Sequence, residues 1–336
     1  MMSGDGSEPR PSSGWQGVGA TVRGSSHERS GTPNQDAFTL YSDTDPPVQI
    51  AVVADGHGSP KSFRSDRGAR FAVQTARETL HATVARIPPD QTDAVIEAEL
   101  REHLPRDLHK AWADAVDADL EHEPFTSDEQ QTLVTKQGEA AADTVRANPR
   151  LAYGATLLAF VATPRFLLFA QLGDGDILLA ENGKVIRAIP KDPRLIANET
   201  TSLCTPEAWN EVVVFYLPLT PPVPPPDLVL LATDGYGNSY ANDADFYRVA
   251  ADLHARIAAR GLGAVAEKLP GWLDATSRGG SGDDITACLL VPDAARGEAE
   301  PAPSSDTNFP DPPTGDTEAA PTDVAHAVAD APDLPL

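Results

Sequence analysis

The chain has 336 residues, of which 40% are apolar and 23% charged, so it can bury a core and is neither fibrous nor wholly disordered. Its 26 basic and 50 acidic residues give a formal charge of −24, which argues against binding nucleic acid or an anionic membrane through a basic surface. It has two cysteines and no run of the roughly 18 apolar residues that a spanning helix needs, so we expect a cytoplasmic protein without membrane insertion.

The composition changes sharply at both ends of the chain. Residues 1–14 are small and polar, and residues 293–336 are mostly Pro, Ala, Asp and Glu, with ten acidic residues and one arginine. Such segments bury too little apolar surface to offset the entropy lost on ordering. We therefore expect a disordered segment at 1–14, one folded domain at 15–292 and a disordered acidic tail at 293–336.

Short apolar runs, separated by turn residues, predict strands along most of the folded part. These runs cover 48–53, 153–160, 166–172, 176–180, 211–217, 227–233 and 284–291. The Asn182-Gly183 pair between two apolar segments is a strong hairpin signal. The pattern is typical of antiparallel strands joined in chain order rather than of regularly alternating strands and helices.

Apolar residues at helical spacing predict three helical regions. They cover 69–84, 100–116 and 249–272, the last interrupted at 261–263. The polar region 119–148 is expected to be partly helical. At the start of the first helix, four cations predict a solvated basic face: Lys61, Arg64, Arg67 and Arg70. Strands and helices together predict an α+β fold.

Aspartates stand at the ends of several apolar strands. Asp55 and Asp234 each follow an apolar run and precede glycine, Asp174 follows another run, and Asp283 precedes the last. A carboxylate among buried residues must bind a proton, a base or a cation, and these segments contain almost no Lys or Arg. Oxygen ligands suit hard ions such as Mg²⁺ or Mn²⁺. One Asp-Gly pair is usually only a turn, but this repeated pattern predicts a metal centre, while leaving open whether the aspartates converge.

Six short motifs occur in one order. They are Asn34-Gln35-Asp36, Asp55-Gly56-His57-Gly58, Gly154-Ala155-Thr156, Leu172-Gly173-Asp174, Thr233-Asp234-Gly235 and Gly280-Ser281-Gly282-Asp283-Asp284-Ile285-Thr286. The series resembles the PPM/PP2C-type metal-dependent serine/threonine protein phosphatases, in a bacterial-type form, over residues 17–291. The resemblance implies a β-sandwich of two antiparallel sheets flanked by α-helices, in α-β-β-α layers, with metal ions in a cleft at one edge.

The resemblance also implies two Mn²⁺ or Mg²⁺ ions, with a third, weaker ion in many members. Carried over residue by residue, the metal ligands are Asp36, Asp55, Gly56, Asp174, Asp234 and Asp283. Asp55 would bridge two ions that share a water, and this water attacks phosphorus directly. His57 matches the proposed general acid, which protonates the leaving serine or threonine oxygen. Asp284 matches a position often occupied by Asn and is not expected to bind metal.

Three positions depart from the family pattern. Gln35 stands where many members have a metal-binding Glu. The usual phosphate-binding arginine, five residues before Asp36, is absent, and we expect Arg29 or His27 to replace it. Asp176 stands where an arginine is common, which makes that loop more acidic.

The implied function is metal-dependent hydrolysis of phosphoserine and phosphothreonine in signalling, with phosphorylated proteins as substrates and an opposing serine/threonine kinase. One alternative is a catalytically weak or inactive relative that acts as a binding or regulatory module, suggested by Gln35 and the absent arginine. The retained Asp55, Asp234 and Asp283 argue against it, because a scaffold has no need to keep like charges together. Another is a metal phosphoesterase for small molecules, although no glycine-rich nucleotide loop supports a nucleotide substrate.

Overall fold

The computed structural model describes residues 13–192, 201–220 and 224–293, and these form two five-stranded sheets with helices outside them. In spatial order, the first sheet contains β1 (Trp15–Val22), β10 (Ile285–Pro292), β9 (Leu228–Ala232), β6 (Asp176–Glu181) and β7 (Lys184–Arg187). The second contains β2 (Ala37–Thr44), β3 (Pro47–Ala54), β4 (Leu157–Ala162), β5 (Phe166–Leu172) and β8 (Val213–Pro218). Every neighbouring pair is antiparallel.

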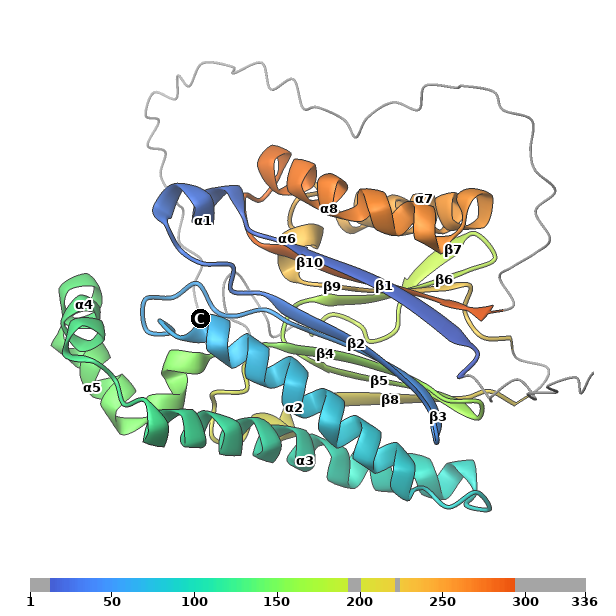
Figure 1. The fold of residues 1–336 in the computed structure, drawn as a ribbon, viewed down its shortest axis with the longest axis horizontal. Helices are drawn as coiled ribbons and strands as arrows, with labels where there is room; N and C mark the ends of the chain where they lie inside the picture. Colours follow the sequence, from blue (N-terminus) through green and yellow to red (C-terminus); the bar gives the residue numbers. More distant parts are fainter. Residues whose placement is uncertain (1–12, 193–200, 221–223, 294–336) are drawn as a thin grey trace, which may run out of the picture.

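A helical layer covers the outer face of each sheet (Figure 1). Helices α2 (Ser65–Arg86) and α3 (Asp93–His122) lie on the second sheet, and α7 (Asp243–Arg260) and α8 (Leu262–Gly279) lie on the first. The shorter helices are α1 (Ser25–Ser30), α4 (Ser127–Gln137), α5 (Glu139–Ala147) and α6 (Asp234–Gly237), with 3₁₀ turns at Pro149–Tyr153 and Ala208–Asn210. These layers confirm the helix-flanked sandwich that the sequence resemblance implied. Within the described ranges, no helix is long and apolar enough to cross a bilayer.

The central strands are buried on both faces, which explains why they read as continuous apolar runs rather than as an alternation. Side chains such as Phe160, Phe169 and Leu231 fill the space between the sheets. On the outer faces, Trp112 of α3 and Phe246 of α7 belong to the two clusters that seal each sheet against its helices. Three apolar layers therefore fix the sheets relative to each other.

Most predicted elements are confirmed, with changes at their ends. The strand expected at 153–160 begins only at Leu157, because the preceding segment forms a 3₁₀ turn. The break between α7 and α8 falls at Gly261, whose φ of +82° suits glycine. Strands β1 and β2 were missed because polar residues and glycines dilute their apolar pattern, and β7 was indicated only by the Asn182-Gly183 hairpin signal. The segments expected to be disordered, 1–14 and 293–336, lie outside the described residues except for positions 13, 14 and 293.

Arg64, at the start of α2, is buried and connects four segments of the chain. Its Nε and Nη2 atoms donate to the two carboxylate oxygens of Glu129 on α4, at 2.7 and 2.9 Å. Its Nη1 atom donates to the Tyr153 hydroxyl and to the carbonyl of Glu123, both at 2.7 Å. The prediction of a solvated basic face is therefore wrong for Arg64, because its guanidinium group is buried and paired with acceptors inside the protein.

We expect Arg64→Ala to lower the free energy of unfolding by about 3 kcal/mol, because it leaves buried acceptors and the Glu129 carboxylate without their partner. Urea denaturation followed by circular dichroism measures this. The matched control is Arg101→Ala on α3, which removes an exposed pair with Glu97 and should cost less than about 1 kcal/mol. Equal effects of the two substitutions would show that the buried arginine does not hold these segments together.

Candidate metal centre

The sheet register brings the predicted acidic residues to one end of the sandwich. Asp55 follows β3 and Asp36 precedes β2, and these two strands are paired where β3 ends and β2 begins. Asp234 follows the end of β9, which pairs with the beginning of β10, and Asp283 lies just before β10. Four carboxyl groups that are far apart in sequence therefore lie at the same end of the two sheets.

Burial and mutual repulsion perturb these carboxyl groups. Burial raises the pKa of Asp55 well above its usual range, and the charges of Asp36, Asp234 and Asp283 raise it further. Burial likewise raises the pKa values of Asp36 and Asp234, and Asp234 is hydrogen-bonded to Asp55. The convergence that spacing alone left open is therefore present in the fold. Like charges this close need protons or cations among them.

Asp36 is oriented by a threonine from the other sheet. The Thr233 hydroxyl donates to Asp36 Oδ2 at 2.8 Å, and the Thr286 backbone N–H donates to the same hydroxyl oxygen at 2.9 Å. The backbone N–H of Asp36 donates to Asn34 Oδ1 at 2.9 Å. Thr233, which sequence reasoning gave no role, thus connects the end of β9 to the beginning of β2. Its signal was its place directly before the Asp-Gly pair.

Asp284 holds the backbone around the site. This buried carboxylate accepts hydrogen bonds from the backbone N–H groups of Gly24 at 2.6 Å and Gln35 at 2.7 Å. His27 Nδ1 lies 2.9 Å from the same carboxylate, and His27 Nε2 lies 3.7 Å from Asp283. The ligand atoms of His27, Asp283 and Asp284 lie within 4.8 Å of one another. Because Asp284 already accepts two backbone hydrogen bonds, we assign it an anchoring role and no ion.

The carboxyl groups open onto a cleft of about 800 Å³. Its acidic and imidazole lining includes Asp55, His57, Asp174, Asp234 and Asp283. Asp36 is buried and is not among the described residues that line the cleft. The lining also contains Lys61 and Lys191, whereas the predicted phosphate-binding residues Arg29 and His27 are not among the described residues that line it.

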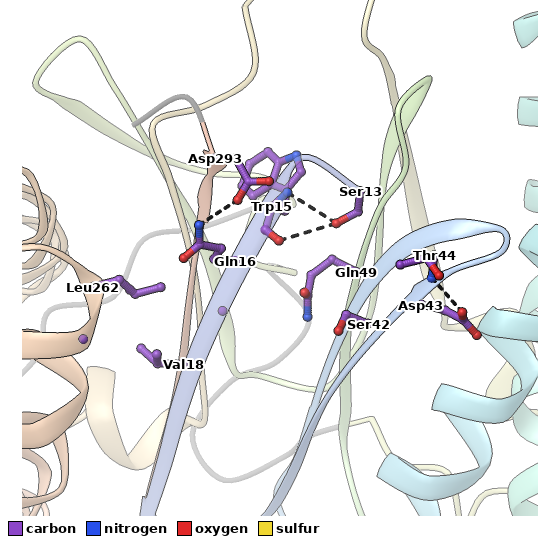
Figure 2. A pocket seen from close by; sticks show the side chains of 12 residues that line it. Ser13, Trp15, Gln16, Val18, Ser42, Asp43, Thr44, Gln49, Leu262 and Asp293 are labelled. Carbon is purple, nitrogen blue, oxygen red and sulfur yellow. Dashed lines mark hydrogen bonds between the residues drawn. The ribbon is translucent and has the colours of Figure 1, made fainter. Parts of the chain in front are cut away.

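A second groove, of about 670 Å³, lies at the opposite end of the sandwich (Figure 2). Its two acidic side chains already have partners: Asp293 accepts from Gln16 Nε2 at 2.8 Å, and Asp43 accepts from the Tyr41 hydroxyl at 2.8 Å. The hydrogen bond from Tyr41 is the main cause that lowers the pKa of Asp43. Unlike the cleft, this groove has carboxylates whose charge is already stabilised.

The Gly154-Ala155-Thr156 motif supports the cleft wall. A Cβ atom at Gly154 would lie 2.4 Å from the His57 ring, so only glycine leaves room for that ring. The Gly154 carbonyl accepts from the His57 backbone N–H at 3.0 Å, and the Thr156 hydroxyl accepts from the Asp55 backbone N–H at 3.0 Å. Burial lowers the pKa of His57, while the nearby Asp174 charge raises it.

Two departures from the family pattern have local structural reasons. The Gln35 amide donates to the Ser65 hydroxyl and to the His57 carbonyl, and an ionised glutamate could not donate these bonds. Asp176 is buried and paired with Arg187 of β7. The prediction that Asp176 leaves the loop more acidic is therefore wrong, because Arg187 neutralises it.

Arg187 was missed by sequence reasoning, since Asp176 lies on the facing strand of the hairpin and its other partners are 56 and 60 residues away. It also donates to both carboxylate oxygens of Asp243, at 2.6 and 2.9 Å, and to the Tyr247 hydroxyl at 2.6 Å. These bonds join β6, β7 and α7 next to the loop that carries Asp174. The only sequence signal was a basic residue at the end of the second strand of the predicted hairpin.

Comparisons with known proteins agree with the site and the fold. The family model described as protein phosphatase 2C matches residues 23–274. A solved bacterial serine phosphatase has a TM-score of 0.50 at 14% identity, over 82% of this chain and 97% of that one. The serine/threonine phosphatase Stp1 from Staphylococcus aureus also has a TM-score of 0.50 at 14% identity, over 85% of this chain and 98% of that one. No curated protein matches the sequence.

The family model covers most of the folded part, and the six motifs that carried the resemblance lie in it or directly after it. The distant solved structures share the sandwich architecture, which supports the fold alone. The resemblance noted in the sequence is thereby confirmed. The chain belongs to the protein phosphatase 2C family.

Proposed function

We propose that this chain is a metal-dependent protein phosphatase that hydrolyses phosphoserine and phosphothreonine. The observation that carries the proposal is the convergence of carboxyl groups, with pKa values raised by burial and by neighbouring carboxylates, at one end of the sandwich in a chain of this family. A fold alone does not imply an activity, so the chemistry of the site has to support it.

The donor set fits hard divalent cations. Carboxylate oxygens dominate the group, and Asp55, Asp36 and Asp234 repel one another unless positive charge lies between them. The proposed ligands of Mn²⁺ or Mg²⁺ are Asp36, Asp55, Gly56, Asp174, Asp234 and Asp283. Bound ions would lower the pKa of a water for direct attack on phosphorus and would offset the phosphate charge.

The remaining roles belong to the chain's own residues. His57 lines the cleft, so it is placed to donate a proton to the serine or threonine oxygen that leaves. The charge of Asp174 favours the protonated form of His57, whereas burial of the imidazole opposes it. Thr233 and Asp284 keep the carboxylates and the surrounding backbone in place. Phosphate binding by Arg29 or His27 stays a prediction.

The proposal extends to the organisation and setting of the chain. Residues 15–292 would form the catalytic domain, with 1–14 and 293–336 as flanking segments. The substrates would be phosphorylated proteins of a cytoplasmic signalling system that includes an opposing serine/threonine kinase. An inactive binding module, the alternative, would gain nothing from the cost of gathering buried like charges.

We expect hydrolysis of p-nitrophenyl phosphate and of a phosphothreonine peptide that depends on Mn²⁺ or Mg²⁺ and stops in EDTA. Asp234→Asn should lower kcat/KM by at least about 100-fold, because it removes a proposed ligand charge. The matched control, Asp107→Asn on the exposed face of α3, should retain full activity. A folded protein that hydrolyses neither ester with either metal would contradict the proposal and favour the binding module. A preference for nucleotides over phosphopeptides would favour the small-molecule phosphoesterase.

The metal-free protein should lose stability as the pH rises. The pKa values of Asp36, Asp55 and Asp234 are raised in the folded state, so this state holds protons that the unfolded chain releases near pH 4. Stability is therefore greatest below the unfolded pKa and falls as the pH rises through the folded values. In EDTA at pH 7, Asp55→Asn should raise Tm by a few degrees, about 1 kcal/mol or more.

Differential scanning fluorimetry between pH 4 and pH 8, with EDTA or Mn²⁺, measures this effect. Mn²⁺ should raise the Tm of the wild-type protein more than that of Asp55→Asn, because a cation bound only to the folded state stabilises it. If Asp55→Asn has a lower Tm in EDTA than the wild-type protein, the neighbouring carboxylates do not destabilise the charge of Asp55. Asp107→Asn serves again as the control.

A further inference from the structure

Among the described residues that line the cleft, Lys61 is a basic residue whose ammonium group has no partner in the fold. Lys61 is half-buried in the segment between the Asp55-Gly56-His57-Gly58 motif and α2, and it lines the same cleft as Asp55 and Asp174. Within the ranges that the structure describes, its ammonium group makes no hydrogen bond or ion pair. In a chain with a formal charge of −24, its ammonium group is thus available for an anionic ligand.

The neighbouring arginines, in contrast, are all paired with acidic side chains. Arg64 is paired with Glu129, Arg67 with Asp119 and Glu123, and Arg70 with Asp66: these pairs measure 2.7, 3.0, 2.5 and 2.9 Å. Of the four basic residues that the sequence grouped together, Lys61 alone keeps its charge free among the described residues. The fold therefore neutralises the arginines and leaves this lysine facing the cleft.

Lys191, the other lysine of the cleft lining, already has a partner. Its Nζ atom lies 3.1 Å from Asp243 Oδ1, and Asp243 is also bound by Arg187. Asp243 therefore stabilises the charge of Lys191. The described lining of the cleft contains no arginine.

The backbone beneath Lys61 is fixed. Its N–H group donates to the Ser59 hydroxyl at 3.3 Å, and the next N–H group, of Ser62, donates to the Ser59 carbonyl at 2.8 Å. The buried Ser62 hydroxyl donates to the Leu151 carbonyl at 3.0 Å. Lys61 therefore lies in a turn that hydrogen bonds fix, so little backbone entropy is lost when its ammonium group binds a ligand.

We propose that Lys61 binds the phosphate group of the substrate, in the role for which the sequence lacks its usual arginine. This inference rests on the proposed phosphatase function and names one residue that would hold its substrate. An ammonium group binds phosphate as a point charge with three donors, without the fixed fork of a guanidinium. Binding by Lys61 should therefore tolerate arginine and should not depend on the peptide around the phosphorylated residue.

The test uses the full chain loaded with Mn²⁺ and the variants Lys61→Gln and Lys61→Arg. Isothermal titration calorimetry with inorganic phosphate reads binding without turnover. We expect Lys61→Gln to weaken phosphate binding about tenfold, as loss of a charged hydrogen bond would. Lys61→Arg should restore it to within about threefold, and the Kd for Mn²⁺ should not change in either variant. Lys136→Gln, an exposed lysine on α4, is the matched control and should bind phosphate like the wild-type protein.

Steady-state kinetics provide the second readout. In Lys61→Gln, KM should rise by a similar factor for p-nitrophenyl phosphate and for a phosphothreonine peptide, because both carry the same phosphate group. A rise for the peptide alone would mean that Lys61 contacts the peptide, and this would overturn the inference. Unchanged phosphate affinity in Lys61→Gln, or its loss in Arg29→Gln instead, would overturn it as well.

The two readouts separate this inference from the proposed function. A wild-type protein that hydrolyses both esters, with Lys61→Gln unchanged in KM and in phosphate affinity, refutes the role of Lys61 and leaves the phosphatase standing. A wild-type protein that hydrolyses neither ester but loses phosphate affinity on Lys61→Gln refutes the activity and supports the lysine as a phosphate-binding residue.

Discussion

The repulsion among buried carboxylates at one end of the sandwich is the constraint on which the rest of the site depends. Burial and neighbouring carboxylates raise the pKa values of Asp36, Asp55 and Asp234, so bringing their charges together costs free energy at neutral pH. The fold holds them together through the register of two sheets whose central strands are buried on both faces. Packing elsewhere thus offsets a local electrostatic cost at the place where chemistry would occur.

Much of the fold could be predicted from the sequence. The doubly buried strands gave long apolar runs, and the helices that cover them gave a clear 3.6-residue period. The edge strand β1 escaped because Gly17 and Gly19 break its apolar pattern, and a Cβ atom at Gly19 would lie 2.6 Å from the Phe38 ring. Its pairing with β10, over 260 residues away, decides its conformation more than its composition does.

The sequence predicted which residue types would bind metal at the site, but not the hydrogen bonds and ion pairs that hold these residues in place. Aspartates after apolar runs pointed to cations, and the family resemblance named them, whereas their convergence required the sheet register. The Arg64–Glu129, Arg187–Asp243 and Asp284–Gly24 contacts could not be inferred, because the partners lie far apart in the chain and another acidic residue or backbone group would have fitted the sequence equally well. Which charged side chains pair depends on their positions in the folded chain, and a single sequence does not give these positions.

The free lysine of the cleft has a consequence for the rate of encounter. The formal charge of −24 opposes the approach of an anionic partner, and this repulsion acts within about one Debye length of the protein, roughly 10 Å at 0.1 M salt. This repulsion would slow the association of an acidic partner, and Lys61 would attract it only near the cleft, so added salt should speed encounter. Of the proposed phosphoprotein substrates, those with positive charge next to the phosphorylated residue would meet less repulsion, so charge around that residue would favour some substrates over others before they reach the cleft.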